Sequence, residues 1–132
     1  MISRFDTGPR MSQVVVHGNT VYLAGEVPDD SAKDVTGQTE EVLAKIDKLL
    51  KQAGSDKTKI LSAQIFLPDM KDFAGMNVAW EKWVVPGQTP ARATVDADTH
   101  SVVIEGLTNG QTLIIGRSSA HTIPASILFM QS

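Results

Sequence analysis

The chain has 132 residues, enough for one domain with a core but too few for two. It is 42% hydrophobic and 20% charged, with a formal net charge of −3, which is typical of a globular protein. The acidic balance argues against nucleic acid and anionic membranes, which attract basic surfaces. Cysteine is absent, which excludes disulfides and thiolate chemistry. No signal-like or membrane-spanning segment is evident, so we expect a cytoplasmic protein.

The first half of the sequence predicts a hairpin, a helix and a strand. Two β-branched runs, 13–17 and 20–24, flank Gly18-Asn19, a pattern typical of a β-hairpin. From about Thr36 to Ala53 the apolar residues recur on one helical stripe. The next strand alternates between an apolar face and a mixed face: Leu61, Ala63, Ile65 and Leu67, against Ile60, Ser62, Gln64 and Phe66. This predicts a sheet covered by helices on one side, with a mixed face that needs another partner, such as another subunit.

The second half predicts one more helix and further strands. Asp69 is placed to cap a helix from about Met70 to Val84, which a Val-Pro-Gly run ends. The predicted buried stripe of that helix is Phe73, Met76, Asn77, Trp80 and Val84. Further strands are expected at 91–95, 101–107 and, after an Asn-Gly turn, 112–115. The order ββαβαββ predicts an α+β protein, with a single mixed β-sheet and two helices on one face.

The last 27 residues differ from the rest in composition. Arg117 is the only charged side chain between Gly106 and Ser132, and the tail from Ser118 has no clear period. We therefore predict a domain over residues 1–105 and an atypical C-terminal extension over 106–132. The extension is either an extra strand with an apolar arm on a neighbouring chain, or an aberrant end that packs poorly.

Arg92 is the residue that carries the strongest functional signal. It follows a Gly/Pro turn and lies between Ala91 and Ala93, which are too small to cover it or to pair with it. A guanidinium group is a permanent cation whose planar donors suit two-point binding of a carboxylate. An ordinary surface or interface ion pair is the alternative at this point.

Several segments occur together in an order that resembles a known family. They are Gly8-Pro9 with Ser12-Gln13, 21–25, Gln38-Thr39, 53–55, 67–70, 73–80 and 87–95. Over roughly residues 3 to 105 the chain resembles the Rid family of reactive-intermediate deaminases, also called the YjgF family. The resemblance implies a chorismate-mutase-like fold, a homotrimer with ligand pockets between subunits, and no cofactor.

The resemblance also implies an activity and the residues that perform it. Active members hydrolyse small enamine or imine acids, such as 2-aminoacrylate or 2-iminobutanoate, to 2-keto acids and ammonia. By position, Arg92 resembles the arginine that holds the substrate carboxylate, and Thr94 the residue whose backbone contacts the substrate. Asn77 matches the helix asparagine near the cleft, and Glu105 the glutamate that positions the attacking water. The expected catalytic residues are therefore Arg92 and Glu105, and the expected substrate-binding residues are Arg92, Thr94 and Asn77.

The sequence differs from the family pattern in three places. Met11 replaces the family's usual tyrosine, and Ala24 replaces a common hydroxyl residue. The interval from Arg92 to Glu105 is a couple of residues short, and a one-residue slip would turn the carboxylate to the other face.

The alternative function is a non-catalytic trimer that binds small carboxylic acids or a partner enzyme. Nucleic-acid binding or cleavage is disfavoured by the lack of a basic stripe, and the scattered histidines predict no metal site.

Overall fold

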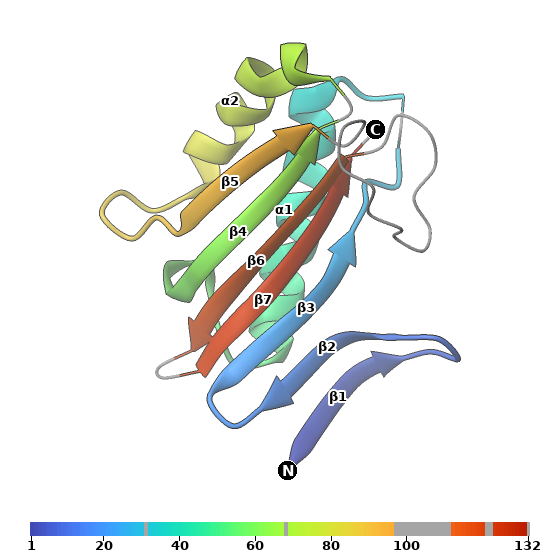
Figure 1. Ribbon diagram of the computed structural model, residues 1–132, viewed down its shortest axis with the longest axis vertical. Coiled ribbons are helices and arrows are strands. Elements are labelled where there is room, and N and C mark those ends of the chain that lie inside the picture. Colours follow the sequence, from blue (N-terminus) through green and yellow to red (C-terminus); the bar gives the residue numbers. More distant parts are fainter. Residues whose placement is uncertain (31, 68, 97–111, 121–122, 132) are drawn as a thin grey trace.

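A single mixed sheet with two helices on one face organises the molecule (Figure 1). The computed structural model describes residues 1–30, 32–67, 69–96, 112–120 and 123–131. The strands are β1 (Ile2–Thr7), β2 (Ser12–His17), β3 (Thr20–Glu26), β4 (Ile60–Leu67), β5 (Ala91–Asp96), β6 (Thr112–Ala120) and β7 (Ile123–Gln131). Their order in the sheet is β1-β2-β3-β7-β6-β4-β5, with β3–β7 and β4–β5 parallel. The predicted α+β class is confirmed.

Helix α1 (Val35–Gln52) lies within one residue of its predicted bounds. Asp34 caps its start, where Oδ1 accepts a hydrogen bond from the Gly37 amide at 2.8 Å. Such a cap satisfies one of the amides that a helix start leaves without a partner. Just beyond the helix end, Gly54 has a φ of +80°, which glycine adopts without a steric penalty.

The predicted second helix is divided into two pieces. Asp69 Oδ1 accepts a hydrogen bond from the Lys71 amide and starts a 3₁₀ helix, Met70–Asp72, before α2 (Phe73–Trp83) begins. Met76 and Trp80 are buried as predicted, whereas Asn77 is half-buried. Phe73 was expected in the buried stripe but is 38% exposed, because it lies in the first turn of the shortened helix.

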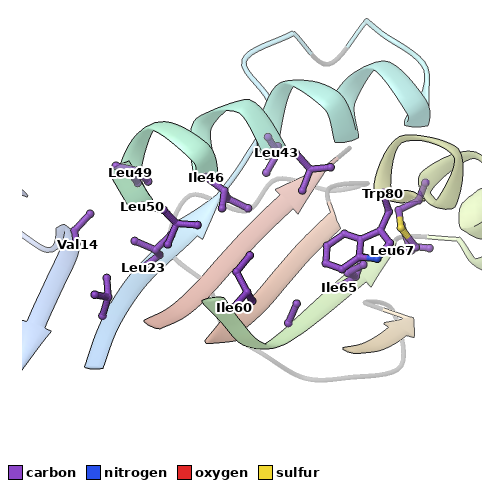
Figure 2. Packing of buried hydrophobic residues seen from close by; sticks show 14 residues of the cluster. Val14, Leu23, Leu43, Ile46, Leu49, Leu50, Ile60, Ile65, Leu67 and Trp80 are labelled. Atoms are coloured by element: carbon purple, nitrogen blue, oxygen red, sulfur yellow. The ribbon is translucent and has the colours of Figure 1, made fainter. Parts of the chain in front are cut away.

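The core lies between α1, α2 and the sheet. Figure 2 shows Ile46 and Leu50 of α1 pointing towards Leu23 of β3, with Trp80 of α2 beside Leu67 of β4. Burying a leucine or isoleucine side chain contributes about 1.5–3 kcal/mol of favourable free energy. The two helices are therefore held to the sheet by their apolar stripes.

The predicted faces of β4 are wrong at its first two residues. Between Ile60 and Ser62 the chain advances by two residues, while the paired strand β6 advances by one, from Ser118 to Arg117. This β-bulge inserts one extra residue and reverses the alternation at the start of the strand. As a result Ile60, not Leu61, joins the core, and Leu61 is 50% exposed.

The structure contains strands near both ends of the chain in addition to those that the sequence predicts. The predicted hairpin is present as β2 and β3, and β1 adds an antiparallel strand that the pattern did not predict. The predicted strand 101–107, the Asn-Gly turn and the boundary after residue 105 lie outside the described residues. Residues 123–131 pair with β3 and β6 inside the sheet, while the domain division itself stays a prediction.

Among the described helices, none has the length and apolar character needed to cross a membrane.

Candidate functional site

Strand β5 presents Arg92 to helix α2 from the edge of the sheet. Side chains alternate along a strand, so Arg92 and Thr94 point to one face and Ala91 and Ala93 to the other. The contacts of Arg92 with α2 identify the first face as the helix side, and both alanines are exposed. Ala91 and Ala93 therefore line the opposite face of the edge strand, where they do not cover the guanidinium.

The guanidinium of Arg92 lies against one face of α2. Its Nη1 donates a hydrogen bond to Asn77 Oδ1 at 2.6 Å and lies 4.0 Å from Met76 Sδ. The guanidinium carbon is 5.3 Å from the ring centroid of Trp80 and 5.7 Å from that of Phe73. Both separations fall within the range of a cation–π interaction. One amide and two aromatic rings thus fix where this cation sits.

Arg92 combines partial burial with hydrogen-bond donors that the described residues leave unused. Burial lowers the pKa of Arg92, and the nearby negative charge of Glu81 acts in the opposite direction. A guanidinium group nevertheless stays protonated in proteins and carries five N–H donors. Within the part of the chain that the structure describes, no carboxylate lies within ion-pair distance of it. The arrangement suits an anionic ligand that supplies the missing acceptor oxygens.

Thr94 lies two residues further along the same face of β5. Its Oγ1 is buried and has no hydrogen-bond partner among the described residues. Buried hydroxyl groups usually form a hydrogen bond. The Thr94 hydroxyl could therefore form one with a ligand that binds at Arg92. The site that the sequence predicts is thus represented by Arg92, Asn77 and Thr94, while Glu105 lies outside the described residues.

The two aromatic partners of Arg92 are the residues that sequence reasoning missed. Phe73 and Trp80 were assigned to the packing stripe of α2, and Trp80 does pack in the core. Their spacing of seven residues places them on one helix face together with Asn77. That spacing was available from the sequence, but the strand that faces them was not.

Other polar clusters near the helices show no sign of a metal centre. A groove of about 420 Å³ between α1 and α2 contains Trp83, whose Nε1 donates to Asp47 Oδ2 at 2.8 Å. Lys57 lies 5.5 Å from the centroid of the same indole ring. Within the described ranges, no group of three or more His, Cys, Asp or Glu side chains is arranged to hold a metal ion.

Comparison with known sequences connects this arrangement to other proteins. Residues 1–103 match a family model described as Endoribonuclease L-PSP. The chain is 50% identical over 96 residues to the RutC family protein YoaB of Escherichia coli K12, covering 73% of this chain and 83% of YoaB. A RutC family protein of Haemophilus influenzae is also 50% identical, over 97 residues that cover 73% of this chain and 84% of that protein.

Solved structures give the same connection. The chain resembles NMB1025, a member of the YjgF protein family from Neisseria meningitidis, with a TM-score of 0.80 and 36% identity. That similarity covers 92% of this chain and 96% of NMB1025. An uncharacterised protein from Pseudomonas aeruginosa has a TM-score of 0.79 and 34% identity, covering 92% of this chain and all of that one.

Proposed function

This chain belongs to the Rid/YjgF family, and from that premise we propose that it hydrolyses small enamine or imine acids to 2-keto acids and ammonia. Substrates of the class of 2-aminoacrylate and 2-iminobutanoate carry one carboxylate beside the reacting carbon. The observation that carries the proposal is the Arg92 guanidinium, held by Asn77 at 2.6 Å and left without an ion-pair partner among the described residues. It provides a charged anchor for that carboxylate.

To catalyse this reaction, the protein needs mainly to bind the substrate and to orient it towards a water molecule. Water adds to the electrophilic imine carbon, the C–N bond then breaks, and ammonia leaves as the carbonyl forms. Arg92 holds the carboxylate so that the imine carbon is presented in one orientation, which lowers the entropic part of the barrier. We propose Glu105 as the group that positions the water and accepts its proton.

A homotrimer with sites between subunits is part of the proposal. Within one chain, β7, β6 and β4 separate β3, which carries Ala24, from β5, which carries Arg92. Because β7 also pairs directly with β4, three to four strand spacings separate β3 from β5, which is roughly 14–19 Å. A site that uses both Arg92 and the region of Met11 and Ala24 therefore requires residues from two subunits.

The second candidate is a non-catalytic protein that binds small carboxylic acids. Met11 and Ala24, which lack the hydroxyl groups usual at these positions in the family, favour it. Their absence removes hydrogen bonds that would hold a water or an amino group, whereas the carboxylate anchor remains. Binding of 2-keto acids at Arg92 without turnover would be its signature.

One experiment tests both candidates. A pyridoxal-phosphate dehydratase generates the imine in the assay mixture, and ammonia release is measured with and without this protein. We expect acceleration over buffer, and a loss of about 100-fold in kcat/KM for Arg92→Ala, the effect of losing a charged hydrogen-bonded anchor. Arg4→Ala, which changes an exposed arginine of β1, is the matched control and should behave as wild type.

Calorimetry with a 2-keto acid separates the outcomes of that assay. Binding that Arg92→Ala abolishes, with no acceleration by the wild type, identifies the non-catalytic candidate. Acceleration or binding that Arg92→Ala leaves unchanged would contradict both candidates.

A further inference from the structure

A second pocket lies at the opposite edge of the sheet from Arg92. It has a volume of about 220 Å³ and is bounded by β1, β2, β3 and α1. Its lining residues are Asp6, Gln13, Glu26, Lys45, Lys48 and Leu49. None of them belongs to the proposed deaminase site.

Glu26 is placed in this pocket by an irregularity in β3. Between Tyr22 and Gly25 the strand advances by three residues while β7 advances by two, so β3 contains one extra residue. The bulge turns Glu26 to the same side as Val21 and Leu23, which face the helices. The side chain is only 7% exposed although it carries a carboxyl group.

Two buried acceptor oxygens belong to residues that line the pocket. Glu26 Oε1 and Gln13 Oε1 are both buried, and neither has a hydrogen-bond partner among the described residues. Burial raises the pKa of Glu26 to about 7, Lys45 lowers it, and Asp29 and Asp6 raise it. Leaving such buried oxygens unpaired is unfavourable, because each loses the hydrogen bonds that it makes to water in the unfolded chain. The pocket is therefore built for a group that donates hydrogen bonds.

The lysines of α1 do not supply those donors. Lys45 Nζ donates to Val27 O and to Asp29 Oδ1, both at 2.7 Å. Lys48 is exposed at the pocket, and no described residue forms an ion pair with it. Considering the described residues alone, the pocket thus presents two acceptor oxygens without a donor and, beside them, a lysine without an ion-pair partner.

We propose that this pocket binds a small zwitterion with a primary ammonium group and a carboxylate, the chemistry of a free α-amino acid. The ammonium group has three donors and meets Glu26 and Gln13, while the carboxylate faces Lys48. An amine without a carboxylate would add a further positive charge beside the two lysines and leave Lys48 without an anion. A carboxylate without an amine would leave both acceptor oxygens unpaired.

Backbone amide shifts of ¹⁵N-labelled protein test the proposal. L-alanine, n-propylamine and propionate are titrated separately into the wild type and into Arg92→Ala, which removes the other carboxylate anchor. We expect alanine to produce saturable shifts at Gln13, Glu26 and Lys48 in both proteins, and at least tenfold weaker binding of the other two probes. Glu26→Gln should weaken alanine binding at least tenfold, whereas the matched control Glu40→Gln, exposed on α1, should not change it.

A ¹³C measurement of the Glu26 carboxyl provides an independent readout in the wild type. Bound alanine should lower the pKa of Glu26, because a neighbouring ammonium favours the charged form. The proposal is overturned if alanine gives no saturable shifts at these amides, if Glu26→Gln binds alanine as well as wild type, or if propylamine binds equally tightly. Should Glu26→Gln fail to fold, the comparison of the three probes on the wild type still decides. Deaminase activity, which is read at Arg92, is unaffected by either result.

Discussion

Glu26 is the residue whose ionisation should matter most for stability. Its pKa is about 7 in the folded protein, against an ordinary value of 4.5, so the folded state holds the proton more tightly. Its stabilising contribution is complete below pH 4.5 and is lost as the pH rises through 7. The difference between the two pKa values corresponds to about 3 kcal/mol.

The first prediction follows from the raised pKa of Glu26. Glu26→Gln keeps the shape and removes the ionisation, so it should be more stable than wild type at pH 8, by up to about 3 kcal/mol, with little difference at pH 4.5. Urea unfolding at several pH values measures the difference. Glu40→Gln should follow the wild-type curve, and a Glu26→Gln curve parallel to wild type would contradict the burial argument.

Asn77 determines whether Arg92 is free to meet a ligand. Asn77→Asp would place a carboxylate at the atom that now accepts from Arg92 Nη1 at 2.6 Å. The new ion pair should compete with the ligand carboxylate and weaken 2-keto acid binding at least tenfold, without loss of thermal stability. Calorimetry and thermal unfolding measure the two effects.

Asn19→Asp makes the same charge change in the exposed turn between β2 and β3 and is the control for that experiment. It should leave binding unchanged. Unaltered binding in Asn77→Asp would mean that Arg92 is not the carboxylate anchor.

At the scale of elements, Gly75 permits the close approach of α2 to α1. A Cβ atom at Gly75 would clash with Val35 Cγ1, and Thr36 Oγ1 donates to the Gly75 carbonyl at 2.7 Å. Gly75→Ala should gain about 1 kcal/mol from helix propensity but lose about 1–3 kcal/mol from overpacking. We expect a net destabilisation of about 1 kcal/mol, measured by urea unfolding.

A second substitution tests the cause of that loss. Val35→Ala in the Gly75→Ala background removes the clashing methyl groups, so the pair should be less destabilised than the sum of the single changes. Strict additivity, or a Gly75→Ala protein more stable than wild type, would show that the helices move apart without penalty.

At the scale of the whole molecule, the sheet leaves one face without helices. Leu61 and Tyr22 lie outside the core cluster and are 50% and 40% exposed, respectively. Apolar side chains exposed on a sheet face without helices offer surface that a subunit interface would bury. This face is where the proposed trimer would be formed.

Light scattering measures the proposed assembly. We expect a mass near three times the 14.2 kDa of one chain. Leu61→Glu should dissociate the trimer, because it places a charge in an apolar contact. Val78→Glu, at a site 46% exposed on α2, is the matched control and should remain trimeric. A monomeric wild type, or a trimeric Leu61→Glu variant, would contradict the proposal.

The sequence by itself determined the fold class, the two helices and most strand positions. Helical and strand periods, the Asp69 cap and the Gly18-Asn19 turn are encoded in neighbouring residues, so local physics suffices to predict them. Ordered segments also placed the chain in its family and singled out Arg92.

Only the tertiary structure decided which side chains meet. The bulges in β3 and β4 depend on their pairing with β7 and β6, and they reversed the expected faces of Ile60 and Leu61 and buried Glu26. The contact of Arg92 with α2 likewise joins residues brought together by the packing of a strand against a helix. Register and packing arise between segments that are distant in the sequence, so no local pattern specifies them.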